Sequence, residues 1–300
     1  MLAEIIAHKK TEIAAKKASG EAEALVAEAR AMPPTRGFAK ALAKAQNHGY
    51  GLIAEFKRKS PSRPTLNPNA DPETTALAYE AGGASCMSVL TDNRYFGGSM
   101  ADLTSASRAS LLPMLCKDFM LDPIQIAHAR TAGADCILLI LACLDDQQAK
   151  TLEAEALSYG LDVLIEVHNE AELTRALSLA SPLIGINNRD LTTMQTDLAT
   201  TEHVLASLAE SETASNDQTR IFIAESGMRT PDDLHRLARA GVRCFLIGEA
   251  LMEAQNNQHD IDIASEVSRF LARPLPRDWQ TSDAAEGDDN NTTRDLGMRV

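Results

Sequence analysis

The sequence of 300 residues carries 29 Lys and Arg against 42 Asp and Glu, which gives a formal net charge of −13. With 44% hydrophobic and 24% charged residues, the composition is that of a globular protein and excludes general disorder. The acidic balance and the lack of a basic patch argue against a nucleic-acid partner.

Disulfides, signal peptides and membrane spans are not expected either. The cysteines are Cys86, Cys116, Cys136, Cys143 and Cys244. They are odd in number, lie in apolar runs and show no C-x-x-C spacing, so we interpret them as reduced thiols. Glu4 and Lys9 interrupt the N-terminal stretch, and no apolar run reaches 18 residues. We therefore expect a cytoplasmic protein without a membrane partner.

The first 48 residues have helical character and precede any strand-like run. They read MLAEIIAHKKTEIAAKKASGEAEALVAEAR, followed after a short break by FAKALAKAQ. We expect these residues to form extra helices that cap one end of the domain that follows.

Eight short apolar runs then recur along the chain, rich in Ile, Leu and Val and without polar alternation. This pattern is typical of parallel strands covered on both faces. The runs are 51–56, 86–91, 114–119, 136–142, 163–168, 183–188, 221–226 and 244–248. Amphipathic stretches with helix start and stop signals lie between them, such as 71–83, 122–134 and 230–242.

Eight strand-then-helix units with right-handed crossovers predict an α/β fold, a (β/α)8 TIM barrel. An open doubly wound sheet is the alternative. We expect one barrel domain over residues 1–272, with 1–48 as its N-terminal helical extension. Residues 210–219 are expected to form a surface loop, and the polar residues 273–300 a disordered tail.

Charged side chains interrupt three of the predicted strands near their C-terminal ends. Glu55 and Lys57 lie two residues apart and therefore point to the same side of strand one. Lys117 interrupts strand three, and Glu166 interrupts strand five. Because alternate strands share a layer inside such barrels, these four groups should converge at one mouth, where they suit acid and base chemistry. Paired structural charges are the alternative interpretation, although four buried together would be costly.

Strands seven and eight end in glycines, Gly227 and Gly248, each followed soon by a helix. Glycine lets backbone N–H groups approach an anion, and the loops after strands seven and eight are the usual phosphate site of phosphosugar barrels. On strand six, Asn187 and Arg189 add hydrogen-bonding groups at the same mouth.

No metal site or organic cofactor is predicted. His168 lies two residues from Glu166 without a third ligand nearby in the sequence. Ser226 lacks the G-x-S-x-G context of a nucleophile elbow, and no G-x-G-x-x-G follows a strand.

Over about residues 1–272 the chain resembles the indole-3-glycerol-phosphate synthase family. The resemblance rests on IAEFKRKSPS, SVLTDNRYFGGS, LCKDFMLDPIQI, GADCILLI, LIEVHNEAEL, GINNRDL, IAESGM and FLIGEALM, all in family order. It implies a barrel enzyme of tryptophan biosynthesis that uses no cofactor. The implied reaction converts 1-(2-carboxyphenylamino)-1-deoxyribulose 5-phosphate to indole-3-glycerol phosphate, releasing carbon dioxide and water.

The resemblance also implies roles for individual residues. Lys117 matches the family's general acid for ring closure, and Glu166 and Lys57 match residues used in dehydration. The remaining matches to the catalytic set are Glu55, which orients the substrate and the lysines, Asn187, which hydrogen-bonds the sugar, and Ser226. Matches to substrate-binding positions are Ser60, Phe96, Phe119, Arg189, Gly227, Gly248 and Glu249, the last through its backbone N–H.

One segment departs from the family pattern. The family usually reads SPSKG after strand one, whereas this chain has Arg63 and Pro64 in place of the lysine and glycine. We expect the fixed φ of Pro64 to alter closure of this loop over the substrate.

Two alternative functions stay open. The chain could be another phosphosugar-binding barrel enzyme of the same pathway, or a barrel that binds a phosphorylated ligand without catalysis.

Overall fold

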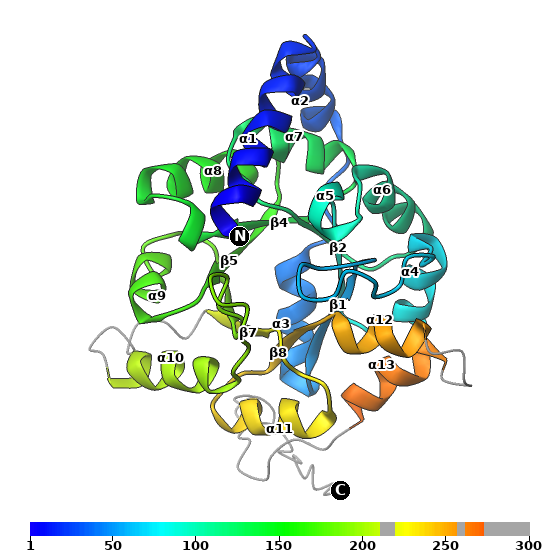
Figure 1. Cartoon of the computed structure of the whole chain (residues 1–300), viewed down its shortest axis with the longest axis vertical. Helices are drawn as coiled ribbons and strands as arrows, with labels where there is room; N and C mark the ends of the chain where they lie inside the picture. Colours follow the sequence, from blue (N-terminus) through cyan, green and yellow to red (C-terminus); the bar gives the residue numbers. More distant parts are fainter. Residues whose placement is uncertain (211–219, 257–261, 273–300) are drawn as a thin grey trace, which may run out of the picture.

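Eight parallel strands form a closed barrel. The computed structural model describes residues 1–210, 220–256 and 262–272, so the predicted tail and all but the first residue of the predicted 210–219 loop lie outside the described residues. Each strand pairs with its sequence neighbours, and β1 pairs in parallel with β8, with Gly51 opposite Cys244 and Ala54 opposite Ile247 (Figure 1). The predicted (β/α)8 barrel is confirmed, since pairing of the first and last strands excludes an open sheet.

The strands begin at or within one residue of their predicted starts. They are β1 (Gly51–Phe56), β2 (Cys86–Leu90), β3 (Met114–Lys117), β4 (Cys136–Ile140), β5 (Asp162–Val167), β6 (Leu183–Asn187), β7 (Ile221–Glu225) and β8 (Cys244–Ile247). All except β1 end one or two residues sooner than predicted. The apolar runs continue into the turns, where Phe119 and Leu141 stay buried although the strand pairing has ended.

Helices follow the strands and surround the barrel (Figure 1). They are α1 (Leu2–Ala18), α2 (Ala22–Ala31), α3 (Phe38–His48), α4 (Pro72–Ala81), α5 (Asn93–Phe96), α6 (Met100–Ala109), α7 (Pro123–Thr131), α8 (Asp146–Ser158), α9 (Glu170–Ala176), α10 (Ala199–Glu210), α11 (Pro231–Arg239), α12 (Glu249–Asn256) and α13 (Ile263–Leu271), with a 3-10 turn η1 (Leu141–Cys143) after β4. The start signals are confirmed: the Asp71 side chain accepts the Thr74 N–H, and Asp122 forms a capping box with Gln125. No helix in the described ranges is long and apolar enough to cross a membrane.

The alternation of side chains along each strand produces two apolar layers. In β1, Leu52, Ala54 and Phe56 belong to the layer between sheet and helices, whereas Ile53 lies in the barrel interior with Leu115. A strand side chain two residues after an interior one also points inward. Glu55 therefore enters the barrel interior, as do the other charged strand residues at the same parity.

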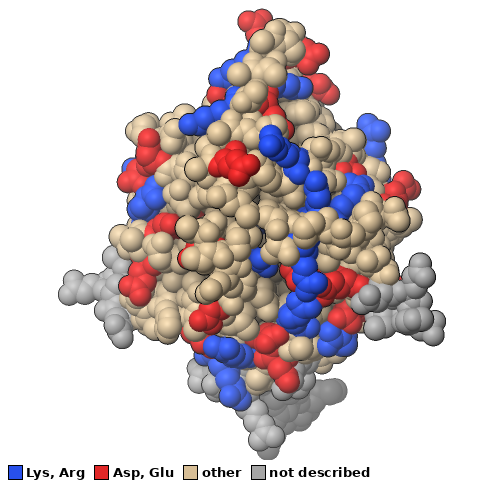
Figure 2. All heavy atoms as spheres, viewed as in Figure 1, with Lys and Arg blue, Asp and Glu red and all other residues tan. Residues whose placement is uncertain are grey.

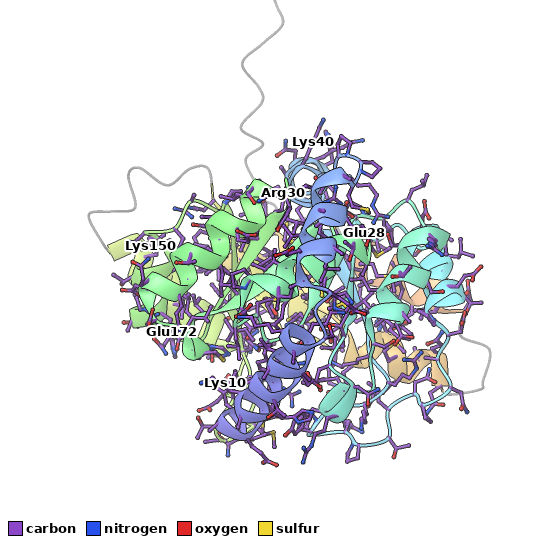
Figure 3. The ribbon with its side chains drawn as sticks, turned by 90° about the horizontal axis from the view of Figure 1, so that it is seen from above. Lys10, Glu28, Arg30, Lys40, Lys150 and Glu172 are labelled. Carbon is purple, nitrogen blue, oxygen red and sulfur yellow. The ribbon has the colours of Figure 1, made fainter. Side chains whose placement is uncertain are left out.

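The N-terminal extension reaches both ends of the barrel rather than capping one. Helix α3 covers the starts of the strands, where Phe38 and Leu42 are fully buried. Helix α1 runs along the barrel to the opposite end, where Leu2 and Ile5 lie beside the ends of β3 and β4. Figure 3, which is turned by 90° from the view of Figure 1, shows Lys40 of α3 at one end of the molecule and Lys10 of α1 toward the other.

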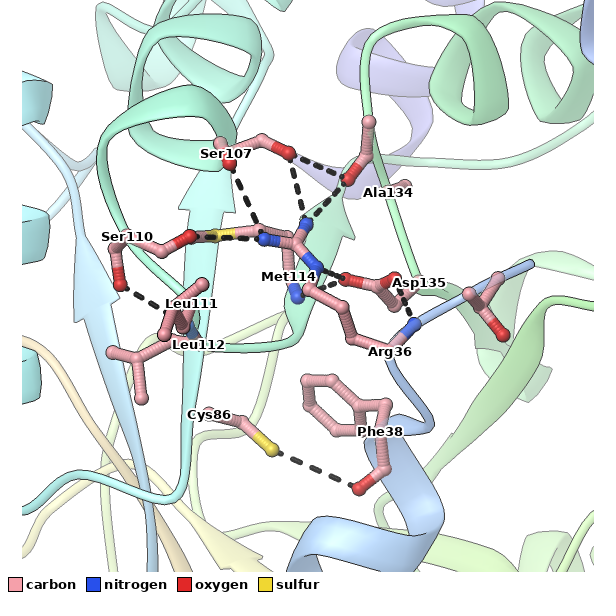
Figure 4. A network of polar contacts seen from close by, with 12 residues as sticks. Arg36, Phe38, Cys86, Ser107, Ser110, Leu111, Leu112, Met114, Ala134 and Asp135 are labelled. Carbon is pink, nitrogen blue, oxygen red and sulfur yellow. Dashed lines mark hydrogen bonds and ion pairs between the residues drawn. The ribbon is translucent and has the colours of Figure 1, made fainter. Parts of the chain in front are cut away.

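Arg36, between α2 and α3, makes several of the contacts that connect the extension to the barrel. Arg36 donates from its backbone N–H and from Nε to the two oxygens of Asp135, both at 2.7 Å (Figure 4). Its remaining guanidinium nitrogens donate to the carbonyls of Ser107, Ser110 and Gly133. Asp135, which is only 2% exposed, lies in the turn before β4, so this contact links the extension to two consecutive β/α units.

We expect Arg36→Ala to lower the free energy of unfolding by about 3 kcal/mol, because it removes the guanidinium group that pairs directly with the buried Asp135 carboxylate. Urea unfolding followed by circular dichroism measures this loss. Lys40→Ala removes an exposed cation from the neighbouring α3 and should change stability by less than about 0.5 kcal/mol. An equal loss of unfolding free energy in the two variants would contradict the role of Arg36 in connecting the extension to the barrel.

Candidate active site

A cavity of about 420 Å³ opens at the C-terminal ends of the strands. Its size is within the range of small-molecule sites. The structure brings all of the predicted site residues to its lining: Glu55, Lys57, Ser60, Phe96, Lys117, Phe119, Glu166, Asn187, Arg189, Ser226, Gly227, Gly248 and Glu249. These residues lie at or after the C-terminal ends of all strands except β4. The end of β4 contributes only apolar side chains, such as Ile140, to the lining.

Lys117 lies between two buried carboxylates. Its Nζ is 3.1 Å from Oε2 of Glu166 and 3.0 Å from Oε2 of Glu225. The other oxygen of Glu166 accepts a hydrogen bond from Asn187 Nδ2 at 3.0 Å, and Ser226 Oγ donates to Asn187 Oδ1 at 2.8 Å. These contacts join residues of β3, β5 and β6 with the end of β7, so each side chain is oriented by another strand.

The second lysine has its own carboxylate. Lys57 Nζ donates to Oε1 of Glu55 at 2.6 Å. Glu55 occupies the barrel interior only because residue 248 is a glycine: a Cβ there would lie 2.4 Å from the same oxygen. Gly185 makes room for Glu225 in the same way, since its Cβ would lie 2.1 Å from Oε1 of Glu225. Gly185 within β6 and Gly248 after β8 thus permit two buried carboxylates.

Burial and charge shift the pKa values of this cluster in opposite directions. Burial opposes the charge of Lys117, but Glu166, Glu225 and Glu55 outweigh it and hold the pKa of the ammonium above its ordinary value. Burial also opposes the charge of Glu166, whose pKa is nevertheless held below its ordinary value, first by Lys117 and then by His168. Burial raises the pKa of Glu225 to about 7, with Lys117 opposing and Glu166 adding to the rise.

The charge count explains why Glu225 differs from Glu166. Three buried carboxylates, Glu55, Glu166 and Glu225, face the two ammonium groups of Lys57 and Lys117. Closely spaced carboxylates cannot all ionise easily in a site of low dielectric constant. Glu225 is 1% exposed and its Oε1 has no hydrogen-bond partner among the described residues, so it is the group that holds a proton longest.

The predicted phosphate end lies across the cavity at the ends of β7 and β8. Ser226 and Gly227 both have positive φ, of 65° and 88°, which turns the chain sharply after β7. A positive φ is unusual for serine and is a form of strain often found at functional sites. Gly248 immediately precedes α12, so backbone N–H groups of two turns border this part of the cavity.

Several arginines surround Glu249 at the rim of the cavity, beside the predicted phosphate end. Glu249 lies 3.3 Å from Arg63, 3.5 Å from Arg189 and 3.1 Å from Arg229. Figure 2 shows basic and acidic side chains interleaved over α11 and α12 on this face. Arg63 thus holds the loop after β1 to α12, and Ser62 of that loop accepts a hydrogen bond from Arg189 at 2.7 Å. The effect of Pro64 on loop closure stays a prediction.

The opposite wall of the cavity is apolar. The rings of Phe96 and Phe119 lie 6.4 Å apart, and Met1, Leu2 and Ile5 of the extension line the same cavity.

A buried lysine keeps α1 in this position. Lys9 Nζ lies 3.0 Å from Asp92 and 2.9 Å from Asp118, the residues that follow β2 and β3. Burial opposes the charge, but the two aspartates and Glu12 hold the pKa of Lys9 above its ordinary value. The cation is therefore retained, and Asp118 is the direct neighbour of Lys117.

Sequence reasoning missed three parts of this site. Glu225 was detectable, because it ends an apolar run in the same way as Glu166 does. Lys9 and the apolar residues of α1 carried no signal, because only the tertiary structure brings the first helix to the mouth. In the described ranges, no group of three His, Cys, Asp or Glu side chains is arranged to hold a metal ion, and the expected absence of a metal and of a cofactor stays a prediction.

We expect Glu225→Gln to change how stability depends on pH. A carboxyl group with a raised pKa binds its proton more tightly in the folded state, so its stabilising contribution is complete below about pH 4.5 and is lost as the pH rises through 7. From pH 5 to pH 8 the variant should therefore gain on the order of 3 kcal/mol relative to the original protein, at about 1.4 kcal/mol per pH unit.

Urea unfolding at the two pH values measures this difference. Glu170→Gln, an exposed carboxylate of α9, is the control and should give a difference that is independent of pH. The same flat result for Glu225→Gln would mean that Glu225 is ionised throughout.

Comparison with known proteins gives the family. The model of the indole-3-glycerol phosphate synthase family matches residues 2–263. Among curated relatives, the indole-3-glycerol phosphate synthase of Azospirillum brasilense is 47% identical over 266 residues, covering 88% of this chain and 97% of the relative. The enzyme of that name from Hyphomonas neptunium (strain ATCC 15444) is 51% identical over 250 residues, covering 83% of this chain and 91% of the relative.

More distant solved structures share only the fold. A mandelate oxidase mutant matches 74% of this chain and 70% of its own at 13% identity with a TM-score of 0.53. A thiamine phosphate pyrophosphorylase from Pyrococcus furiosus matches 75% of this chain and 95% of its own at 14% identity with a TM-score of 0.51. The family match spans most of the chain, so the chain belongs to the indole-3-glycerol phosphate synthase family, carboxy-lyases of tryptophan biosynthesis.

Proposed function

We propose that this cavity converts 1-(2-carboxyphenylamino)-1-deoxyribulose 5-phosphate to indole-3-glycerol phosphate, with Lys117 as the central acid. The observation that carries the proposal is the ammonium group of Lys117, held between Glu166 and Glu225 at 3.1 and 3.0 Å and open to the cavity. Ring closure requires a proton at the ketone oxygen as the aromatic carbon attacks it. A charged donor inside a site of low dielectric constant supplies both the proton and the electrostatic stabilisation.

Proton transfer from Lys117 to the substrate makes Glu166 more basic. In the resting site, the ammonium group contributes to the low pKa of Glu166. Once Lys117 has donated its proton, that contribution is lost and Glu166 becomes a stronger base. Loss of carbon dioxide then leaves the electron pair of the broken carbon–carbon bond in the benzene ring of the substrate, which restores the aromaticity of that ring.

Dehydration follows with a second pair of groups. Glu166 is the ionised carboxylate and accepts a proton from the substrate, while Lys57, paired with Glu55 at 2.6 Å, donates a proton to the departing hydroxyl. Asn187 hydrogen-bonds the sugar. Its contacts with Glu166 and Ser226 fix the orientation of the amide for this role.

The substrate lies across the cavity with its two ends in different surroundings. Its phosphate binds at Gly227, Gly248 and the backbone N–H of Glu249, with Ser60 and Arg189 as further contacts, since helix N-termini and guanidinium groups favour anions. Its aromatic ring packs against Phe96 and Phe119, the two rings on the apolar wall. A cytoplasmic location agrees with five cysteines that are all free thiols.

Lys117→Ala tests the central role. We expect turnover of the carboxyphenylamino ribulose phosphate to fall by about 10² to 10⁴, as for loss of a general acid, while the fold is retained. Indole fluorescence follows product formation. Lys150→Ala, an exposed lysine of α8, should leave turnover unchanged. An unchanged rate in Lys117→Ala would remove that residue from its role, and ligand binding by the original protein without any turnover would favour a non-catalytic barrel.

Lys9→Met tests the wall contributed by α1. We expect KM to rise by about tenfold, equivalent to about 1.4 kcal/mol, because α1 loses its buried anchor and the apolar wall loosens. Steady-state kinetics measure the change, and Lys10→Met, an exposed neighbour on the same helix, is the matched control. Equal KM values for the two variants would show that Lys9 does not maintain the wall.

A further inference from the structure

His168 is a buried charged group that the proposed reaction does not use. It follows β5, two residues after Glu166, and only 11% of its side chain is exposed. Its Nε2 lies 3.3 Å from Oε1 of Glu166, and its Nδ1 lies 3.1 Å from Oε2 of Glu172. The contact with Glu166 is an ion pair rather than an aligned hydrogen bond. The ring thus lies between two carboxylates, one in the active site and one on α9.

Glu172 is itself firmly held. Its Oε2 accepts the backbone N–H of His168 at 2.8 Å, and its Oε1 accepts Asn169 Nδ2 at 3.1 Å. Asn169 in turn caps α9 by accepting the backbone N–H of Glu172 at 2.9 Å. Figure 3 shows Glu172 on the same side of the barrel as Lys10 of α1, opposite Lys40. The position of the imidazole is therefore set by the start of a helix as well as by the strand.

The two carboxylates determine the protonation of the ring. A neutral imidazole has one N–H group and one nitrogen lone pair, so it would present a lone pair to one of the two anions. An imidazolium presents N–H groups to both. Both contacts are favourable only in the charged form.

We propose that His168 is a positioning residue, held as an imidazolium, that keeps Glu166 ionised and fixed in place for Lys117. The catalytic part of this proposal rests on the proposed function of Glu166. Glu166 then has a cation on each side, Lys117 at Oε2 and His168 at Oε1, together with the amide of Asn187. Without His168, two ammonium groups alone would face the three buried carboxylates of the site.

The surroundings of the ring favour the charged form. Burial lowers the pKa of His168, but the contacts with the carboxylates of Glu166 and Glu172 outweigh it and raise the pKa to about 10. Asp190, after β6, is a further anion that interacts with the ring. Cys143 of η1 faces both glutamates, and burial raises its pKa to about 12, so it stays a neutral thiol. Lys117 of β3 is the opposing cation, and it lies on the far side of Glu166.

Two substitutions separate the charge of His168 from its hydrogen-bonding position. In His168→Gln, the amide nitrogen can replace Nε2 opposite Glu166 without a charge. In His168→Asn, the amide nitrogen can replace only Nδ1, on the side of Glu172. We expect kcat to fall by about 10-fold in His168→Gln and by about 100-fold in His168→Asn, with KM within about twofold of the original.

The pH profile distinguishes positioning of Glu166 from a general structural role. Removing the imidazolium raises the pKa of Glu166, so the acid limb of the kcat profile should move to higher pH in both variants. His128→Gln, a partly buried histidine of α7 away from the cavity, is the control and should leave the profile unchanged. If both His168 variants keep the original kcat and acid limb, the proposal is wrong.

Nuclear magnetic resonance tests the protonation without any activity. In the original protein labelled with ¹⁵N-histidine, one of the seven histidines should stay an imidazolium from pH 6 to pH 8, assigned to His168 through its backbone amide. Glu172→Gln should lower the pKa of that ring. A His168 that is neutral at pH 7.5 in the original protein overturns the proposal, even if a substitution at 168 prevents folding. Absence of turnover in the original protein would instead count against the proposed function.

Discussion

The ammonium group of Lys117 and its two carboxylate partners form the interaction on which the rest of the site depends. Lys117 lies on β3, Glu166 on β5 and Glu225 on β7, and the three meet because alternate strands of a closed barrel share one interior layer. None of these charges would be tolerated singly in such a place, since an unpaired buried ion costs several kcal/mol. The closed barrel makes the cluster possible, and the cluster restricts what the neighbouring positions can be.

Several features of the neighbouring strands follow from that restriction. Gly185 and Gly248 leave space for the carboxylates of Glu225 and Glu55. Asn187 donates a hydrogen bond to the second carboxylate oxygen of Glu166. Ser226, whose backbone has a strained positive φ, donates a hydrogen bond to Asn187. A polar network of this kind is stable only when nearly every member has a partner. The residues around the lysines are therefore parts of one electrostatic arrangement.

The N-terminal extension supports this arrangement from outside the barrel. Arg36 connects the extension to the starts of β3 and β4 through Asp135. Lys9 connects it to the opposite ends of β2 and β3 through Asp92 and Asp118. Between these two ties, α1 brings apolar side chains to the mouth beside Phe96 and Phe119. The same segment thus stabilises the barrel and completes the cavity, so a change in its anchors affects both stability and binding.

Local patterns in the sequence predicted the α/β class, the eight strands and most of the residues that line the cavity, whereas the pairing of β1 with β8 decided between the barrel and the open sheet. Uninterrupted apolar runs are visible locally, and a charged residue at the end of such a run, such as Lys117 or Glu166, stands out against its neighbours. The predicted C-terminal ends of the strands were less accurate, because apolar residues such as Phe119 remain buried after the backbone pairing has ended. Glu225 carried the same local signal as Glu166.

The pairing of the charges and their protonation states could not be predicted from local patterns, because they depend on how the strands come together. The partners of Lys117 lie 49 and 108 residues away in the chain, and no local pattern encodes that distance. The pKa of Glu225, the contacts of His168 and the place of α1 at the mouth depend on burial and on charges contributed by several elements at once. Such quantities arise from the three-dimensional arrangement of the chain, because electrostatic interaction depends on separation in space and on exclusion of water.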